Sequence, residues 1–376
     1  MNFRQINRYF KKNRQNGLIV LVAAVAVILM VAITLFKSCG KNDGDESVSE
    51  DSISIDLAIG FVSADAVSED AAEEEEKEPA PGTVSSDLAA RFYEGYKVVQ
   101  DSREKYISDP EVISEYAVLI DMSDGHIVAS RNPKDKIYPA SMTKVLAILT
   151  ACDLLDSLSG NFVMTQDITN YTFSHDCSAV CYSVGEEMSV EELFYGTILP
   201  SGADACLGLA DVSAGSMEAF VDEMNKKADE LGLSATSHFA NPVGIFDKEN
   251  YSTPCDIAMI MKAALEKDIC RKALSKHHYV TAKTKEHPDG IDISNWFLRR
   301  IEDKDPPGEV LAGKTGFVSQ SMFCAVSCLE NTDGNLFILC TAGSSSSWKA
   351  IYDHARIYRQ FASGTVSKDS AVSENQ

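Results

Sequence analysis

Positive charge is scarce in this chain of 376 residues. Its 34 lysines and arginines face 56 aspartates and glutamates, which gives a formal net charge of -22. No stripe of basic residues occurs in the part of the chain that we expect to fold. Because binding to nucleic-acid phosphates requires clustered Lys and Arg, this composition argues against nucleic acid as a partner.

The chain also lacks a complete set of metal ligands. Cys177 and Cys181 lie close to His175 in the sequence, but no second C-x-x-C or H-x-x-x-H pair follows to supply four ligands. We therefore expect no metal and no cofactor. Two other interpretations of this cysteine pair remain open. The two residues could form a local disulfide, which an exported location would permit, or they could be free thiols.

One uncharged apolar run of 20 residues, 17–36, is long enough to cross a bilayer as a helix. Basic residues without any acid precede it in residues 1–16, so the positive-inside rule places the N-terminus in the cytoplasm. A cleaved signal has a shorter apolar region, of about 7 to 15 residues. Since a small-x-small exit is also absent, we favour a retained single-pass anchor. Lys37, just before Cys39, disfavours a lipoprotein signal.

Residues 40–87 hold 15 acidic and two basic residues and are otherwise rich in Ser and Ala. Such a segment cannot bury enough apolar surface to fold. We therefore predict five parts in chain order, with the folded domain outside the cytoplasm. These are a cytoplasmic basic segment (1–16), a transmembrane anchor (17–36), an acidic linker (37–87), a folded domain (88–365) and a tail (366–376).

The most informative motif of the folded domain is Ser141-Met-Thr-Lys144. Residues three apart on a helix are neighbours, and Pro139 suits the first turn of a helix. Ser141 should then lie at the positive end of the helix dipole, beside the amine of Lys144. Both the dipole and burial would lower the pKa of that amine. Lys144 is therefore a candidate base and Ser141 a candidate nucleophile for acyl transfer.

Two further motifs follow in a fixed order. They are Ser201-Gly-Ala203 and Lys314-Thr315-Gly316, which complete the set S-x-x-K, S-x-N-like and K-T-G of the serine enzymes that recognise penicillin. With the segments 116–121, 193–200, 241–244 and 251–254, the chain resembles the low-molecular-weight D-alanyl-D-alanine carboxypeptidases. The resemblance covers roughly residues 87–362.

The resemblance implies an α+β fold of the DD-peptidase and β-lactamase type. We expect a five-stranded antiparallel sheet covered by helices, with a helical lobe on one side and the active site between them. Strand patterns at both ends of the domain and helical patterns between them favour the same arrangement. Many members of the family add a small β-rich C-terminal domain. We expect none in this chain.

The resemblance also implies residue roles. Ser141 attacks the substrate carbonyl, Lys144 takes its proton, and Ser201 relays a proton to the departing amine. Lys314 and Thr315 hold the terminal carboxylate, while Gly316 leaves room for the substrate. The backbone N–H groups of Ser141 and Phe317 form the oxyanion hole. The implied partners are peptidoglycan stem peptides ending in D-Ala-D-Ala, β-lactams, and the bacterial membrane through the N-terminal helix.

One departure separates the chain from the family pattern, because Ala203 stands where the family has Asn. Loss of one hydrogen bond, worth about 0.5 to 1.5 kcal/mol, predicts weakened turnover rather than complete loss. A weakened penicillin-binding sensor or wall-binding module is therefore an alternative function. A β-lactamase is another, although no E-x-x-x-N signature follows Ser201.

Overall fold

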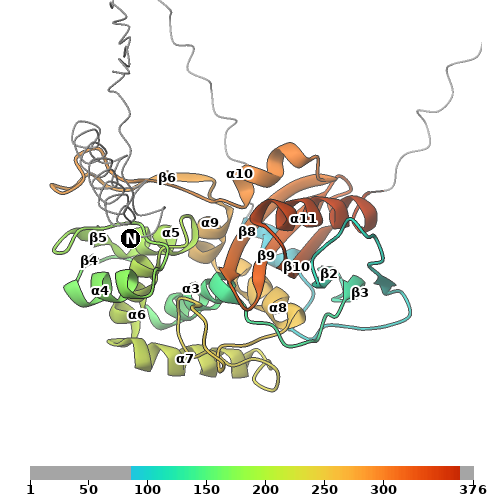
Figure 1. The fold of residues 1–376 in the computed structure, drawn as a ribbon, viewed down its shortest axis with the longest axis horizontal. Coiled ribbons are helices and arrows are strands. Elements are labelled where there is room, and N and C mark those ends of the chain that lie inside the picture. Colours follow the sequence, from blue (N-terminus) through green and yellow to red (C-terminus); the bar gives the residue numbers. More distant parts are fainter. Residues whose placement is uncertain (1–85, 365–376) are drawn as a thin grey trace, which may run out of the picture. The chain divides into compact units, whose positions relative to one another are not determined.

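The computed structural model describes residues 86–364 (Figure 1). The expected cytoplasmic segment, the transmembrane anchor, the tail and nearly all of the acidic linker lie outside these residues. Among the helices of the described part, none has both the length and the apolar character that crossing a membrane requires.

A six-stranded sheet organises the domain, and its strands come from both ends of the sequence. In spatial order they are β1 (Lys105–Tyr106), β3 (Ile127–Arg131), β2 (Tyr116–Asp121), β10 (Leu336–Ser344), β9 (Met322–Asn331) and β8 (Gly308–Val318). All neighbours pair antiparallel except β1 and β3, which pair parallel. The expected class is confirmed, but the sheet has one strand more than predicted. Both residues of β1 are exposed. The strand therefore has no alternation of apolar and polar residues from which it could be predicted.

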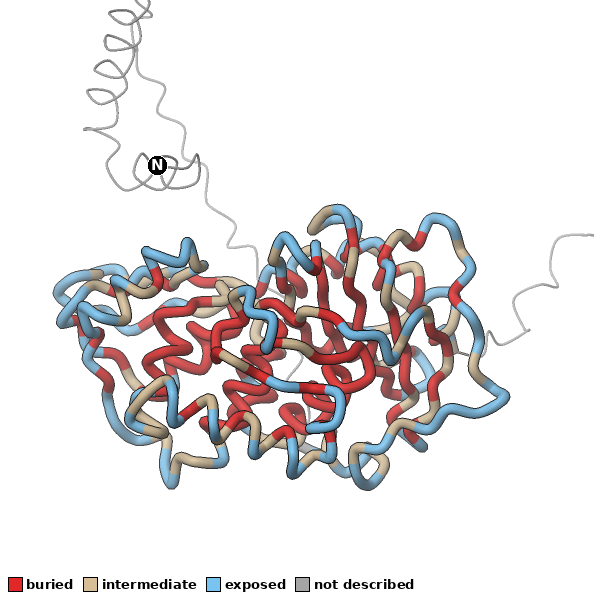
Figure 2. Tube along the Cα trace, turned by 60° about the horizontal axis from the view of Figure 1, so that its bottom comes forward, coloured by how far each residue is buried: buried red, intermediate tan, exposed pale blue. Residues whose placement is uncertain are grey.

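The central strands read as nearly continuous apolar runs because both faces of the sheet are buried (Figure 2). On β2, Val118 and Ile120 belong to one core cluster, while the alternating Ala117 and Leu119 belong to the other. Successive side chains of a strand point to opposite faces. The sheet therefore divides the core into two layers.

Helices cover each of these layers (Figure 1). On one face lie α3 (Thr143–Leu154) and α8 (Pro254–Leu265), and on the other lie α10 (Leu298–Ile301) and α11 (Ser347–Phe361). The starts of α8 and α11 follow from local chemistry, since the side chains of Thr253 and Ser346 accept backbone N–H bonds as N-caps.

A helical lobe follows α3 in the chain, as the sequence predicted. It contains the helices α4 (Gln166–Ser174), α5 (Val190–Ile198), α6 (Ala203–Ala214) and α7 (Met217–Glu230), with α9 (Asp268–Ser275) beside α5. Two hairpins were not predicted, β4 (Asn161–Val163) with β5 (Glu187–Ser189) and β6 (His278–Val280) with β7 (Asp292–Ser294). Strands of three residues are too short to establish a period in sequence.

Candidate active site

Ser141 lies in a short 3-10 turn, η2 (Ala140–Met142), that leads directly into α3. The sequence predicted one continuous helix from Pro139, and the structure tightens its first turn. Lys144 is only 2% exposed, whereas Ser141 is half-buried. The Lys144 Nζ lies 3.2 Å from the Ser141 Oγ. The predicted neighbours are therefore within hydrogen-bond reach, with the hydroxyl accessible and the amine enclosed.

The surroundings of Lys144 favour its neutral form. Burial lowers the pKa of the Lys144 amine below its ordinary value, because a charged amine loses its hydration there. Ionised Cys206, Cys177 or Asp204 would act in the opposite direction. The amine also donates to the backbone oxygen of Val243 over 2.6 Å, which orients it beside Ser141.

The turn at Asn241 to Gly244 supplies that carbonyl and also touches the nucleophile segment. The Asn241 Oδ1 accepts the N–H of Gly244 over 2.7 Å. Gly244 has a φ of +74°, and a Cβ there would lie 1.9 Å from the Ala140 oxygen. Only glycine fits both requirements. The Val243 side chain is 2% exposed, so this residue contributes to the site through its carbonyl.

Ser201 lies between α5 and α6 and has a φ of +61°, a conformation that non-glycine residues rarely adopt. The Lys314 Nζ donates to its Oγ over 2.9 Å and to the Thr315 carbonyl over the same distance. Lys314 is 2% exposed. Burial lowers the pKa of this amine strongly, and the charge of Lys144 lowers it further. Strained, non-glycine backbone of this kind occurs most often at functional sites.

Strand β8 brings the third motif against the nucleophile. A Cβ on Gly316 would lie 3.0 Å from the Ser141 nitrogen and 2.8 Å from the Cys324 Sγ, so a larger residue would disturb this approach. Thr315 is half-buried, and Phe317 is 50% exposed with its ring against Phe323 at 4.4 Å. The structure thus brings all seven predicted site residues to one place.

That strand is also an edge of the sheet. Among the described residues β8 pairs only with β9. The Asn295 side chain donates to the Gly313 carbonyl over 3.0 Å and covers the edge at that point. An edge strand can pair with an extended peptide. The residues beyond Gly313 therefore offer backbone groups to a ligand lying beside Ser141.

Residues around the second motif hold the site together without facing it. Ala203 is fully buried, and its N–H donates to the Ser178 carbonyl over 2.8 Å. The buried Asp204 carboxylate accepts the N–H groups of Val180 and Cys181 over 2.9 and 2.8 Å. Sequence reasoning gave Asp204 no role, although an acid in the first turn of a predicted helix is a recognisable anchor for backbone N–H groups.

The nine cysteines of the described part form no disulfide. Cys324, Cys328 and Cys340 are buried within strands β9 and β10. Cys177 and Cys181 do not form a cluster of metal ligands with His175. The group of potential metal ligands in the described residues is instead Asp121, Asp124 and His126.

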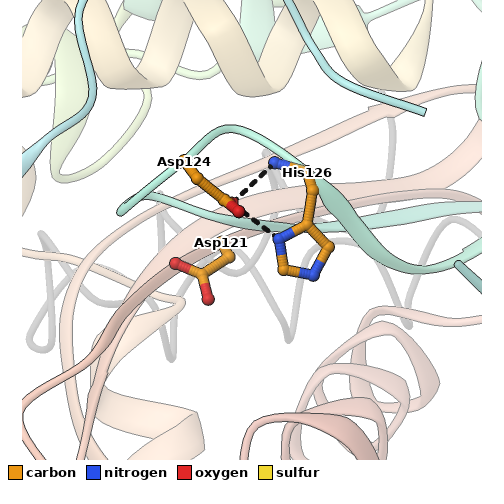
Figure 3. Close-up of side chains that lie close together, drawn as sticks. All are labelled: Asp121, Asp124 and His126. Atoms are coloured by element: carbon orange, nitrogen blue, oxygen red, sulfur yellow. Dashed lines mark hydrogen bonds and ion pairs between the residues drawn. The ribbon is translucent and has the colours of Figure 1, made fainter. Parts of the chain in front are cut away.

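That group lies in the turn between β2 and β3, where His126 and Asp124 point toward each other (Figure 3). The Asp124 carboxylate accepts from the His126 ring over 2.6 Å and from Arg103 over 2.8 Å. Asp121 accepts the N–H and the hydroxyl of Ser123. These contacts account for all three side chains as parts of a stabilised turn.

A serine whose proton can pass to a buried, neutral lysine can form and break an acyl bond. The hydroxyl of Ser141 is within hydrogen-bond reach of the buried Lys144 amine, and that of Ser201 is within reach of the buried Lys314 amine. Such chemistry requires no metal. The arrangement favours acyl transfer to a substrate that carries a negative group beside Lys314.

Comparisons with known proteins agree with this geometry. The D-alanyl-D-alanine carboxypeptidase family profile matches residues 103–340. The carboxypeptidase DacF of Bacillus subtilis is 33% identical over 215 residues, which cover 55% of this chain and 52% of that protein. DacC of Escherichia coli is 32% identical over 168 residues, which cover 43% and 42%. The match therefore spans about half the length of these relatives.

Solved structures show the same fold. The Streptomyces K15 DD-transpeptidase superposes with a TM-score of 0.61 at 22% identity, covering 67% of this chain and 98% of its own. A D-alanyl-D-alanine carboxypeptidase from Mycobacterium tuberculosis gives 0.60 at 23%, covering 71% and 97%. The family profile spans well over half of the sequence and contains all three motifs. The chain belongs to the D-alanyl-D-alanine carboxypeptidase family.

Proposed function

We propose that this protein is a membrane-anchored serine DD-carboxypeptidase that removes the terminal D-alanine from peptidoglycan stem peptides. The observation that carries the proposal is a pair of lysine–serine contacts. The Lys144 Nζ lies 3.2 Å from the Ser141 Oγ, and the Lys314 Nζ lies 2.9 Å from the Ser201 Oγ. In each pair a half-buried serine hydroxyl contacts a buried lysine amine, and burial lowers the pKa of that amine.

In the proposed mechanism the Ser141 Oγ attacks the carbonyl of the penultimate D-alanine while its proton passes to Lys144. The tetrahedral intermediate then collapses to an ester on Ser141. The amine of the terminal D-alanine leaves with a proton relayed through Ser201. Water, activated by the same groups, hydrolyses the ester and restores the Ser141 hydroxyl.

Substrate binding follows from the same residues. Lys314 and the Thr315 hydroxyl hold the terminal carboxylate, because a fixed amine and a hydroxyl suit an anion. Since Lys314 is buried, the arriving carboxylate favours its charged form and makes the pair a charge-assisted contact. The N–H groups of Ser141 and Phe317 stabilise the oxyanion. A β-lactam would form the corresponding ester on Ser141.

The catalytic domain comprises residues 88–365 in this proposal. A helix at residues 17–36 anchors it, and the acidic linker 37–87 lets it reach the wall polymer from the outer face of the membrane. Protease added to intact spheroplasts should release the domain by cutting within the linker. A domain that stays protected would contradict this topology.

The function is tested by two measurements on the same preparation. Mass spectrometry of a digest after penicillin treatment should place the adduct on Ser141, and a label on another serine would refute the site. Release of D-alanine from a pentapeptide should accompany it. Labelling without release would support the alternative of a penicillin-binding sensor, whereas rapid turnover of penicillin itself would support a β-lactamase.

Restoring the family's amide at Ala203 should not improve the enzyme. The added hydrogen bond is worth about 0.5 to 1.5 kcal/mol, but Ala203 is fully buried, and overpacking a core costs about 1 to 3 kcal/mol. We expect Ala203→Asn to lower the free energy of unfolding and to release D-alanine no faster than the parent. The half-buried Ala214, at the other end of α6, is the control for the same change. Faster release with unchanged stability would show that the site has room for the amide.

A further inference from the structure

The only two tryptophans of the chain lie together on the surface, far from each other in sequence. Trp296 precedes α10 and is 57% exposed, while Trp348 lies near the start of α11 and is 47% exposed. The Arg300 guanidinium joins them, 4.6 Å from the centre of the Trp296 ring and 4.8 Å from that of Trp348. Figure 1 shows α10 beside α11, away from α3.

The same surface continues along α11. Tyr352 is 48% exposed, and the Lys304 amine lies 5.6 Å from the Trp348 ring and 5.8 Å from the Tyr352 ring. We call Trp296, Arg300, Lys304, Trp348 and Tyr352 the aromatic-cationic patch. Aromatic rings of this size are costly to leave in water, so their shared exposure requires an explanation.

Packing of α10 against α11 does not supply that explanation. Phe297, Leu298 and Ile301 are fully buried beneath the patch, and Tyr358 of α11 is fully buried in the same core cluster. These side chains already join the helices to the sheet. The exposed rings add little to that core, because about half of each lies in solvent.

A pocket of about 220 Å³ opens at one end of the patch, lined by Ser294, Trp296, Arg299 and Arg300. Arg299 donates to the Ser294 hydroxyl over 3.0 Å. Within the part of the chain described, the Arg300 guanidinium contacts the two indoles and has no side-chain hydrogen bond or ion pair. The pocket therefore presents an aromatic ring, a hydroxyl and two guanidinium groups, with no carboxylate in its lining.

We propose that this pocket binds an acidic sugar, with the sugar ring against Trp296 and its carboxylate on Arg299 and Arg300. The C–H face of a pyranose matches an indole, and a guanidinium fork matches a carboxylate. The pocket is smaller than those that enclose drug-sized ligands, so it suits one ring of a longer chain. The remaining rings would contact neighbouring sugars.

On the proposed function, the ligand is the glycan strand of peptidoglycan. Every second sugar of that strand carries a lactyl group, which exposes a carboxylate wherever the stem peptide has been removed. An anionic membrane is a poorer match, because Glu302 and Asp303 flank the patch and Asp303 pairs with Lys304. The patch therefore lacks the uniform cluster of basic residues that binds an anionic membrane surface.

The patch is also tied to the candidate active site. The Asn295 side chain donates to the Gly313 carbonyl over 3.0 Å, and a Cβ on Gly313 would lie 2.3 Å from the Phe297 ring. These residues flank Trp296, and Gly313 precedes Lys314. A glycan strand bound at the patch would keep the polymer near the strand that binds its peptide.

Both tryptophans lie in the patch, so fluorescence excited selectively at tryptophan, which avoids the 13 tyrosines, reports on this patch. Titration with peptide-free glycan strands should give a saturable change. Chitotetraose, a neutral amino-sugar chain, should bind at least about tenfold more weakly. Phosphatidylglycerol vesicles should cause no change. If the vesicles alone change the signal, the patch binds a membrane and the proposal is wrong.

Arg300→Gln keeps both tryptophans and should weaken binding of the strands by about tenfold or more. Lys226→Gln, which removes an exposed charge on α7, is the control and should bind as the parent does. Penicillin acylation of both variants should match the parent, which shows that they fold. Unchanged binding by Arg300→Gln would overturn the proposal. Because binding is measured without turnover, a failure of the carboxypeptidase assay leaves this result independent.

Discussion

Penicillin should acylate the Lys144→Arg variant about 10²- to 10⁴-fold more slowly than the parent, the range that a positioned base contributes. Arginine keeps a positive charge but cannot give up its proton at working pH. The parent amine lies 3.2 Å from the Ser141 Oγ in a buried place that favours its neutral form. Stopped-flow measurement of the acylation rate at saturating penicillin gives the result.

Lys262→Arg is a matched control for this substitution. Lys262 is 1% exposed, lies in α8, and pairs with Glu266 over 2.5 Å, away from Ser141. If Lys262→Arg acylates normally while Lys144→Arg does not, loss of a base explains the difference better than crowding by a larger side chain. A Lys144→Arg variant that keeps more than a few per cent of the rate would mean that another group accepts the proton.

The pH dependence of acylation follows from the same amine. Only neutral Lys144 can take the proton, so the rate should rise with pH and level off above the lowered pKa of the folded protein. Between that pKa and the higher one of the unfolded chain, the unfolded state binds more protons, so the free energy of unfolding should rise with pH as well. A rate that falls across this range would contradict the assignment.

Gly244→Ala should slow acylation by about 10²-fold or more, although residue 244 touches no substrate in the proposed mechanism. Two costs combine at this position. A residue with a Cβ pays about 1 to 2 kcal/mol to adopt a left-handed conformation, and here φ is +74°. The new Cβ would also lie 1.9 Å from the Ala140 oxygen, so the segment that begins Ser141 must move. A displacement of about 1 Å at a nucleophile costs on the order of 10²-fold in rate.

The chain offers a control that separates these two costs. Gly215, the residue that ends α6, has a φ of +78°, and a Cβ there would meet nothing within 4 Å. Gly215→Ala should therefore lose stability in thermal unfolding but keep the acylation rate. Equal loss of acylation in both variants would show that general destabilisation, rather than displacement of Ser141, is responsible.

Much of the site could be predicted because it consists of short motifs with fixed local geometry. Ser141 and Lys144 are neighbours through helical spacing alone, and the K-T-G glycine predicts a close approach to the strand. The supporting groups could not be predicted. The carbonyl that orients Lys144 belongs to Val243. Every residue has a backbone carbonyl, so the residue type at this position does not indicate the contact.

The extent of the sheet was predicted less completely than its class. Successive side chains of β2, β9 and β10 are buried in one core cluster and then in the other. These strands are therefore apolar runs in the sequence, and their positions can be predicted. β1 has two exposed residues and forms only because the chain passes beside β3. An exposed strand of that length is stabilised by its neighbour's backbone and leaves no pattern of its own.

The sequence by itself determined the family, the order of the three motifs and the division into a sheet with a helical lobe, since local spacing and hydrophobic period specify these. Only the tertiary structure decided that residues 141, 201 and 314 meet, that both lysines lose their water, and that the two tryptophans share one arginine. Burial and proximity between distant segments are properties of packing. Packing determines the pKa of each lysine and the surroundings of the arginine. The residue types alone determine neither property.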